Sequence, residues 1–208
     1  MKKINKIGQI IPKQYVGNET GAQAEINAGD AVGARHKFLE AKQRLLDINH
    51  WHVYSGTKAT IFQLTNAQGH PIDRTPEVGD YIRIDLPGPG SKAGQGYDWV
   101  RIEQFEDKSD KQADIDFFGF RVRPASNPIN VDNTDLAHFY NEQTTSTFFV
   151  QRDGSNIMAC EKGRNEVPKV KTDQVLDNIR NTMVATAATL GLSIPQWKIL
   201  MEGILNFK

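Results

Sequence analysis

The hydrophobic positions of this chain follow a helical period at both ends and a strand period in the middle. Near the N-terminal end, apolar residues from Arg35 to Ile48 lie on one helical face and charged residues on the other, which predicts an amphipathic helix. The segment 16–33 before it is small, polar and rich in glycine, and it predicts a loop or loosely held arm. We therefore expect an arm over residues 1–34 and a single domain over 35–208.

Toward the C-terminal end, the period becomes helical again. Thr172 or Asp173 can cap a helix over 172–190, and Gly191 follows where a left-handed residue is favoured. Ser193 and Gln196 form a capping box, which predicts a second helix over 194–206. Two C-terminal helices are therefore expected, the first of them long.

Short runs of β-branched and aromatic residues occupy the middle of the chain, with turn residues between them. The Asp153-Gly154 pair lies between two such runs and predicts a tight hairpin. No helical pattern separates the runs, which argues against a βαβ nucleotide-binding unit. The predicted strands are 59–64, 81–86, 99–105, 115–123, 137–141, 145–151 and 156–162.

The order of these elements predicts an α+β fold. In it, a curved antiparallel sheet of about seven strands packs around the long C-terminal helix. Such an arrangement leaves a place for a small-molecule cavity between helix and sheet.

The stretch from Phe38 to Gly56, in which Trp51 follows an amphipathic helix, adds a resemblance to this pattern. Together with the element order, it resembles the SRPBCC or START-like superfamily, which includes polyketide-cyclase-like proteins. The resemblance covers about residues 35–190 and implies a helix-grip fold. It also implies binding of a hydrophobic ligand, or cyclase-like or hydrolase-like chemistry in the cavity.

Composition narrows the possible partners. The 208 residues include 25 Lys plus Arg and 25 Asp plus Glu, so no general attraction to nucleic acid is expected. No apolar run is long enough to span a membrane. The single cysteine, Cys160, excludes an internal disulfide, and the N-terminus has no secretory pattern, so a cytoplasmic location is expected.

The sequence contains no recognisable cofactor-binding or metal-binding motif. The Gly/Pro-rich stretch 86–97 contains a lysine but lacks the Lys-Ser/Thr pair and the following helix of a phosphate loop. His50 and His52 would share one face of an extended chain, but no third ligand is identifiable by spacing. We therefore expect no cofactor and no metal.

Our leading hypothesis is a protein that binds an apolar or amphipathic small molecule in the cavity. Aromatic side chains would form its walls, and Arg121 and His138 would orient the ligand. Arg121 and Arg123 could instead pair with Glu103 or Glu142 within the sheet. The predicted ligand-binding residues are Trp51, Tyr54, Phe117, Arg121, His138, Tyr140 and Met183.

Two alternatives stay open at this stage. An enzyme of the same fold could use His138 for acid/base chemistry, with Tyr140 and Glu142 on the same predicted strand face. An interaction protein could instead form a homo-oligomer through the last helix, if the apolar stripe of Trp197, Ile204 and Phe207 has no partner within the chain.

Overall fold

A computed structural model describes residues 9–56, 60–86, 91–110, 113–169 and 195–207 of the chain. The strands are β1 (Asn18–Asn27), β2 (Ile61–Thr65), β3 (Tyr81–Asp85), β4 (Asp98–Lys108), β5 (Ile115–Pro124), β6 (Thr145–Asp153) and β7 (Asn156–Glu166). The helices are α1 (Ala31–Leu46), the 3₁₀ helix η2 (Ile48–His50) and α2 (Trp51–Tyr54), and residues 195–204 form a C-terminal helix.

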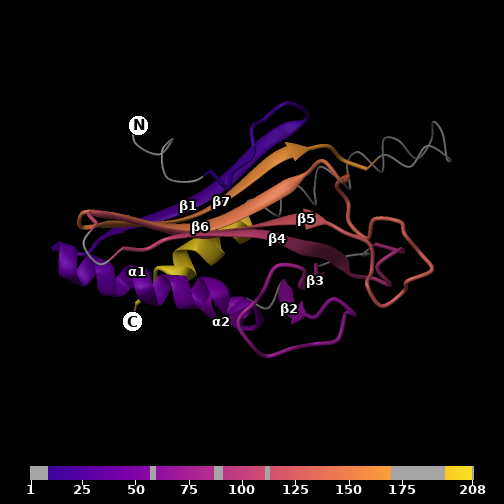
Figure 1. Ribbon diagram of the computed structural model, residues 1–208, viewed down its shortest axis with the longest axis horizontal. Coiled ribbons are helices and arrows are strands. Elements are labelled where there is room, and N and C mark those ends of the chain that lie inside the picture. Colours follow the sequence, from indigo (N-terminus) through magenta and orange to yellow (C-terminus); the bar gives the residue numbers. More distant parts are fainter. Residues whose placement is uncertain (1–8, 57–59, 87–90, 111–112, 170–194, 208) are drawn as a thin grey trace.

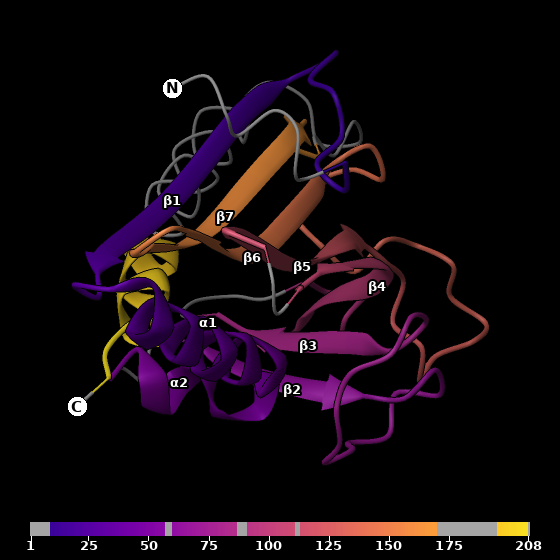
Figure 2. The same cartoon turned by 60° about the vertical axis from the view of Figure 1, so that its left-hand side comes forward.

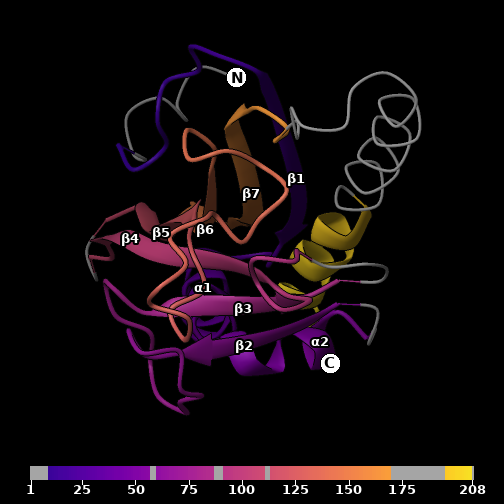
Figure 3. The ribbon, with the colours of Figure 1, turned by 90° about the vertical axis from the view of Figure 1, so that its right-hand side faces the viewer.

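All seven strands form one antiparallel sheet in the order β1-β7-β6-β5-β4-β3-β2. The sheet is strongly bent, so that β1 and β7 stand steeply to β2 and β3 (Figure 3). The helices α1 and 195–204 both lie on the inner side of this bend (Figure 1). The first and last strands are neighbours, the helices α1, η2 and α2 connect β1 to β2, and a C-terminal helix packs on the inner face. This arrangement is a helix-grip α+β fold, as the resemblance implied.

The N-terminal region differs from the expected arm. Residues 18–27 form β1, which pairs along its length with β7, and the predicted loop over 16–33 is therefore wrong. The helix starts at Ala31 instead of Arg35, because the Asp30 side chain accepts a hydrogen bond from the Gly33 amide and caps it. The division of the chain at residue 34 remains a prediction about folding units.

The predicted strand at 137–141 is also wrong. This segment is a loop: it forms no continuous ladder, and its strand-like pairing within the described residues is the isolated bridge between Tyr140 and Pro168. The predicted count of seven strands is right because the missed strand β1 offsets this false one. The Asp153-Gly154 hairpin is confirmed: Asp153 pairs with Asn156, and Gly154 has a φ of 59°.

Helix 195–204 confirms the last predicted helix and supplies the gripped element. Its apolar stripe, Leu200, Met201, Ile204 and Leu205, is buried in the main core together with residues of α1 and of the sheet. The predicted helix over 172–190 lies outside the described residues. Of the residues named for an oligomer interface, Ile204 is buried, whereas Trp197 and Phe207 are partly buried against the same core. A homo-oligomer through this helix stays a prediction.

Helix α1 begins beside the β6–β7 turn, where the Ala28 amide donates to the Ser155 carbonyl, and runs away from it to η2 and α2, beside the strands in Figure 2. Ala34, Phe38, Ala41 and Leu45 form its buried face. No described helix is long and apolar enough to cross a membrane.

Candidate functional site

Trp51, a predicted ligand-binding residue, lies in the core between the sheet and helix 195–204. It is 1% exposed, and its ring centroid lies 5.1 Å from those of Phe62 and Phe148. Trp197, from the C-terminal helix, adds a further ring 5.1 Å from Phe148. Close packing of these rings gives Trp51 a role in the core.

A groove lies where the C-terminal helix meets the edge of the sheet. It has a volume of about 450 Å³ and lies beside β1, the end of α2 and helix 195–204. The lining residues are Ala24, Glu25, Ile26, Tyr54, Ser55, Ile199, Glu202, Gly203, Leu205 and Asn206. This is a helix–sheet site of the expected kind, but it involves the second predicted C-terminal helix instead of the first.

The groove has an apolar floor and an acidic rim. Ala24 and Ile26 are half-buried on the inner face of β1, and Ile199 is 41% exposed on the helix. Glu202, on the helix, contributes a carboxylate whose only ion pair among the described residues is with Lys198, at 3.9 Å. The Glu25 side chain lies on the outer face of β1, where it accepts from Gln23 Nε2 at 3.2 Å. The groove can therefore hold an apolar body while offering negative charge to its end.

Tyr54 is the predicted ligand-binding residue that lines this groove. Its hydroxyl donates to Asp47 Oδ2 at 2.5 Å, and Arg44 lies over its ring. Burial and the neighbouring Asp47 carboxylate raise the pKa of Tyr54 to about 12. Tyr54 is thus a fixed, neutral wall of the groove.

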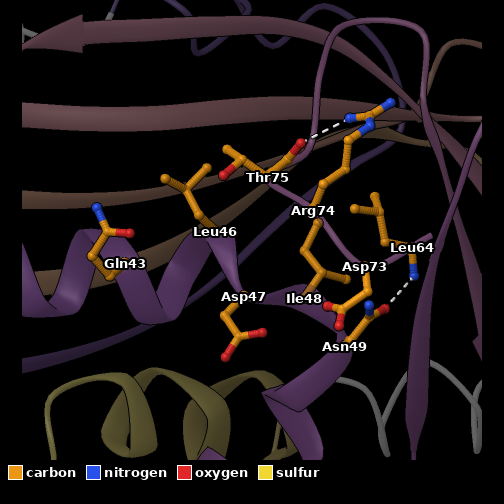
Figure 4. Close-up of a pocket in the computed structure, with 9 residues that line it drawn as sticks. All are labelled: Gln43, Leu46, Asp47, Ile48, Asn49, Leu64, Asp73, Arg74 and Thr75. Atoms are coloured by element: carbon orange, nitrogen blue, oxygen red, sulfur yellow. Dashed lines mark hydrogen bonds between the residues drawn. The ribbon is translucent and has the colours of Figure 1, made fainter.

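A second, smaller pocket of about 140 Å³ lies at the C-terminal end of α1 (Figure 4). Polar groups from α1, η2 and the 73–75 segment surround it, and Asn49 Oδ1 accepts from the Leu64 amide at 2.8 Å. Asp47 there also contacts His50 Nδ1 at 2.7 Å, which raises the pKa of His50. The close-up shows polar side chains beside Leu46, Ile48 and Leu64, and the pocket has about a third of the volume of the groove, so it has room only for a smaller ligand.

Phe117 and Arg121 lie on the opposite face of the sheet. Phe117 packs in a separate small cluster with Ile10, Phe149 and Cys160. Arg121 Nε donates to Glu103 Oε2 at 3.0 Å, and Arg123 binds the same carboxylate. The alternative in which the arginines pair within the sheet is therefore the one observed, and neither predicted residue shares a site with Trp51.

His138, Tyr140 and Glu142 do not form the predicted strand face. The rings of His138 and Tyr140 stack at 5.8 Å within the loop, and His138 Nδ1 accepts from the Tyr140 amide at 3.0 Å. Burial lowers the pKa of His138 to about 3, so the imidazole is neutral at physiological pH. Glu142 is exposed, and no contact in the described part of the chain joins its carboxylate to His138. This geometry gives no support to His138 as a general acid.

Met183 lies outside the described residues, so the predicted set is divided. Only Tyr54 lines the groove, whereas the others lie in the core, on the opposite sheet face or in the 137–144 loop. His50 and His52 belong to helical turns instead of an extended strand, with ring centroids 6.4 Å apart. Within the described ranges, no group of three or more potential metal ligands occurs.

Sequence reasoning missed a pair of buried acids, Glu161 and Glu166, on β7. Glu161 is 1% exposed and Glu166 is 5% exposed. The signal was available for Glu161, because it follows Ile157 and Ala159 on the inner face of the strand. Its place in that apolar series marks the Glu161 carboxyl group as buried.

Comparison with solved structures finds similar shapes at low identity. The Zhui aromatase/cyclase from Streptomyces sp. R1128 is 8% identical with a TM-score of 0.38, over 90% of this chain and 92% of that one. An uncharacterised protein from Bacillus thuringiensis is 14% identical with a TM-score of 0.37, over 91% and 100%. Norcoclaurine synthase from Thalictrum flavum is 11% identical with a TM-score of 0.37, over 95% and 100%.

No family model and no curated protein matches this sequence. The fold is a helix grip. That assignment follows from the strand order and the packed C-terminal helix of this chain.

Proposed function

We propose that this protein binds an amphipathic small molecule in the groove between β1 and the C-terminal helix. The observation that carries the proposal is the groove itself, about 450 Å³ in volume at the junction of helix and sheet. This volume falls within the range of about 300–1,000 Å³ in which small-molecule sites are found. Trp51, in contrast, is 1% exposed and packed among aromatic rings.

The lining defines the class of ligand. Ala24, Ile26 and Ile199 would contact an alkyl or ring system, because their side chains are only partly covered. Glu202 would face its polar end and favour an amine or another donor over a carboxylate. We therefore propose a cationic or donor-bearing amphiphile.

We also place the protein in the cytoplasm. Burial raises the pKa of the single thiol, Cys160, to about 12, so this cysteine is an inert core residue that requires no oxidising compartment.

The first experiment is native mass spectrometry of the purified protein, followed by displacement of the apolar dye N-phenyl-1-naphthylamine. Dodecylamine and dodecanoate serve as competitors, because they carry the same chain with opposite head charge. We expect dodecylamine to displace the dye at a concentration about tenfold lower than dodecanoate. Equal potency would contradict the assigned role of the acidic rim.

Two variants on one strand locate the site. Ala24→Trp fills the groove, whereas Gln23→Trp places the same ring on the opposite, exposed face of β1. We expect Ala24→Trp to lose dye binding and Gln23→Trp to retain it, with both folded by circular dichroism. Dye binding unchanged in Ala24→Trp would overturn the proposal.

A further inference from the structure

Of the two buried acids, Glu166 lies at the end of β7 remote from the β6–β7 turn, and Glu161 lies midway along the strand. Glu161 points to the inner face of β7, in register with Phe148 on β6 and Ala22 on β1. The Ser146 hydroxyl hydrogen-bonds to its carboxyl group, but Oε2 has no partner. A buried carboxylate oxygen without a donor is costly, so this position requires a physical explanation.

Glu166 joins Glu161 through an irregularity at the end of β7. Asn165 adopts a φ of 54°, which interrupts the alternation of the strand. The Glu166 side chain then lies over Gly163, where a Cβ atom would collide with its carboxylate and with Thr20 Oγ1. The glycine therefore makes room for the second acid.

Hydroxyl groups contact Glu166 from two different elements. Thr20 Oγ1, on β1, donates to Glu166 Oε1 at 2.9 Å, and the Tyr140 hydroxyl hydrogen-bonds to the same carboxyl group from the 137–144 loop. Glu166 Oε2 has no partner. The pair therefore links the edge strand and the loop to the end of β7.

The charges around the pair do not neutralise it. Lys162 and Arg164, which act on it from a distance, alternate with Glu161 along β7 and so leave the strand on the opposite face. Arg164 is also shared with Glu19, at 3.8 Å. The groups that contact the pair are hydroxyls: Ser146 on β6, Thr20 on β1 and Tyr140 in the loop.

Burial and the neighbouring carboxylate raise the pKa of Glu161 to about 8, and burial raises that of Glu166. Two adjacent buried carboxylates without a cation cannot both ionise cheaply. A proton on Glu161 removes the charge from this buried carboxyl group and with it the repulsion of Glu166.

The same strand end also anchors the segment that precedes β1. Asn165 Oδ1 accepts from the Tyr15 amide at 2.8 Å, and Asn165 Nδ2 donates to the Lys13 carbonyl. Thr144 Oγ1, in the loop, donates to the Asn165 carbonyl at 3.0 Å. A change at Glu166 therefore reaches both neighbours directly.

We propose that Glu161 keeps a proton in the folded protein, and that loss of this proton repels the Glu166 carboxylate from its Thr20 and Tyr140 contacts and so loosens β1 and the 137–144 loop at the end of β7. The device is independent of the proposed ligand groove. It makes the contacts of β1 and the 137–144 loop with the end of β7 tighter in mildly acidic than in alkaline solution.

The sign follows from proton linkage. The folded protein binds the proton more tightly than the unfolded chain, in which a glutamate has its ordinary pKa, so stability is lost as pH rises from that value toward about 8. Between pH 6 and pH 8, we expect the unfolding equilibrium constant of the wild type to rise about tenfold more than that of Glu161→Gln. Glutamine keeps the shape of the side chain but cannot ionise.

Urea denaturation at a series of pH values measures this difference, with Glu19→Gln as an exposed control that should follow the wild type. Hydrogen exchange, corrected for the intrinsic effect of pH, should show faster opening of residues 18–22 and 137–144 above pH 8. If Glu161→Gln shows the wild-type pH dependence, the proposal is wrong. Should that variant fail to fold, carboxyl ¹³C NMR of the wild type decides, because titration of Glu161 near pH 4.5 would overturn it.

Discussion

Two buried acidic sites on the inner face of the same sheet have different partners for their carboxyl groups. Asp116, on β5 near the β6–β7 turn, is completely buried, and it contacts Arg152 Nε at 2.6 Å and Arg35 Nη1 at 3.0 Å. Glu161 and Glu166, midway along β7 and at its other end, have hydroxyl partners and two orphan oxygens. One end of the sheet compensates a carboxylate with fixed cations, whereas the other end depends on a proton that the solvent can remove.

The difference teaches what each end can do. An arginine remains charged at every physiological pH, so the Asp116 site is a permanent tie between β5, β6 and α1. A carboxyl pair changes its charge within the physiological range, so the tie it makes is conditional. The following predictions test this contrast in order of decreasing effect.

Removing the charge of Asp116 should have the largest effect. Asp116→Asn leaves Arg152, which is 3% exposed, without a counter-charge, and we expect a loss of about 3–5 kcal/mol in the free energy of unfolding. Urea denaturation measures it. Asp107→Asn is the matched control: its partner is Lys42, its side chain is 46% exposed, and its loss should stay below about 1 kcal/mol. Equal losses in the two variants would show that the buried Asp116 contributes no more to stability than the exposed Asp107.

Filling the space over Gly163 should have an intermediate effect. Gly163→Ala forces the Glu166 carboxylate and the Thr20 hydroxyl to move, and we expect a loss of about 1–3 kcal/mol. Adding Glu166→Ala removes the obstructing carboxylate, so the double variant should be more stable than the sum of the two single changes predicts. Strict additivity in a double-mutant cycle would show that Gly163 does not serve Glu166.

Asp98 is a further buried acid, and it tests whether a carboxyl group without a cation makes stability depend on pH. Burial alone raises its pKa to about 7, so folding is penalised increasingly as pH rises from the ordinary aspartate value toward 7. Asp98→Asn should abolish this part of the pH dependence and leave the variant relatively more stable at pH 8 than at pH 4. Denaturation curves at the two pH values test it, and a parallel response of variant and wild type would refute it.

The smallest effect on stability should come from Glu202, on the groove rim. Its ion pair with Lys198 spans 3.9 Å between two exposed side chains, so Glu202→Gln should change stability by less than about 0.5 kcal/mol. The same change should weaken dodecylamine binding while sparing that of the neutral dye. Unaltered dodecylamine displacement would remove Glu202 from the site.

The sequence alone determined the fold class and most of the sheet. Strands β2 to β7 carry enough β-branched and aromatic residues to be recognised locally, and the Asp153-Gly154 turn has its own chemistry. Strand β1 is rich in small and polar residues, and it is a strand because β7 offers it a complete antiparallel edge. The 137–141 segment has the reverse character: its composition is typical of a strand, but no neighbour continues the ladder.

The tertiary structure decided where side chains with similar patterns would be used. Trp51 belongs to the core because Trp197 and Phe148 close around it, and Phe117 and Arg121 lie beyond the sheet because alternation sends them to its other face. The groove exists only where helix 195–204 meets β1, about 170 residues apart in sequence. Glu161 and Glu166 become partners only because Asn165 breaks the alternation of β7. Secondary-structure propensity depends on neighbouring residues in the sequence, whereas a site depends on which distant segments share a face of the sheet.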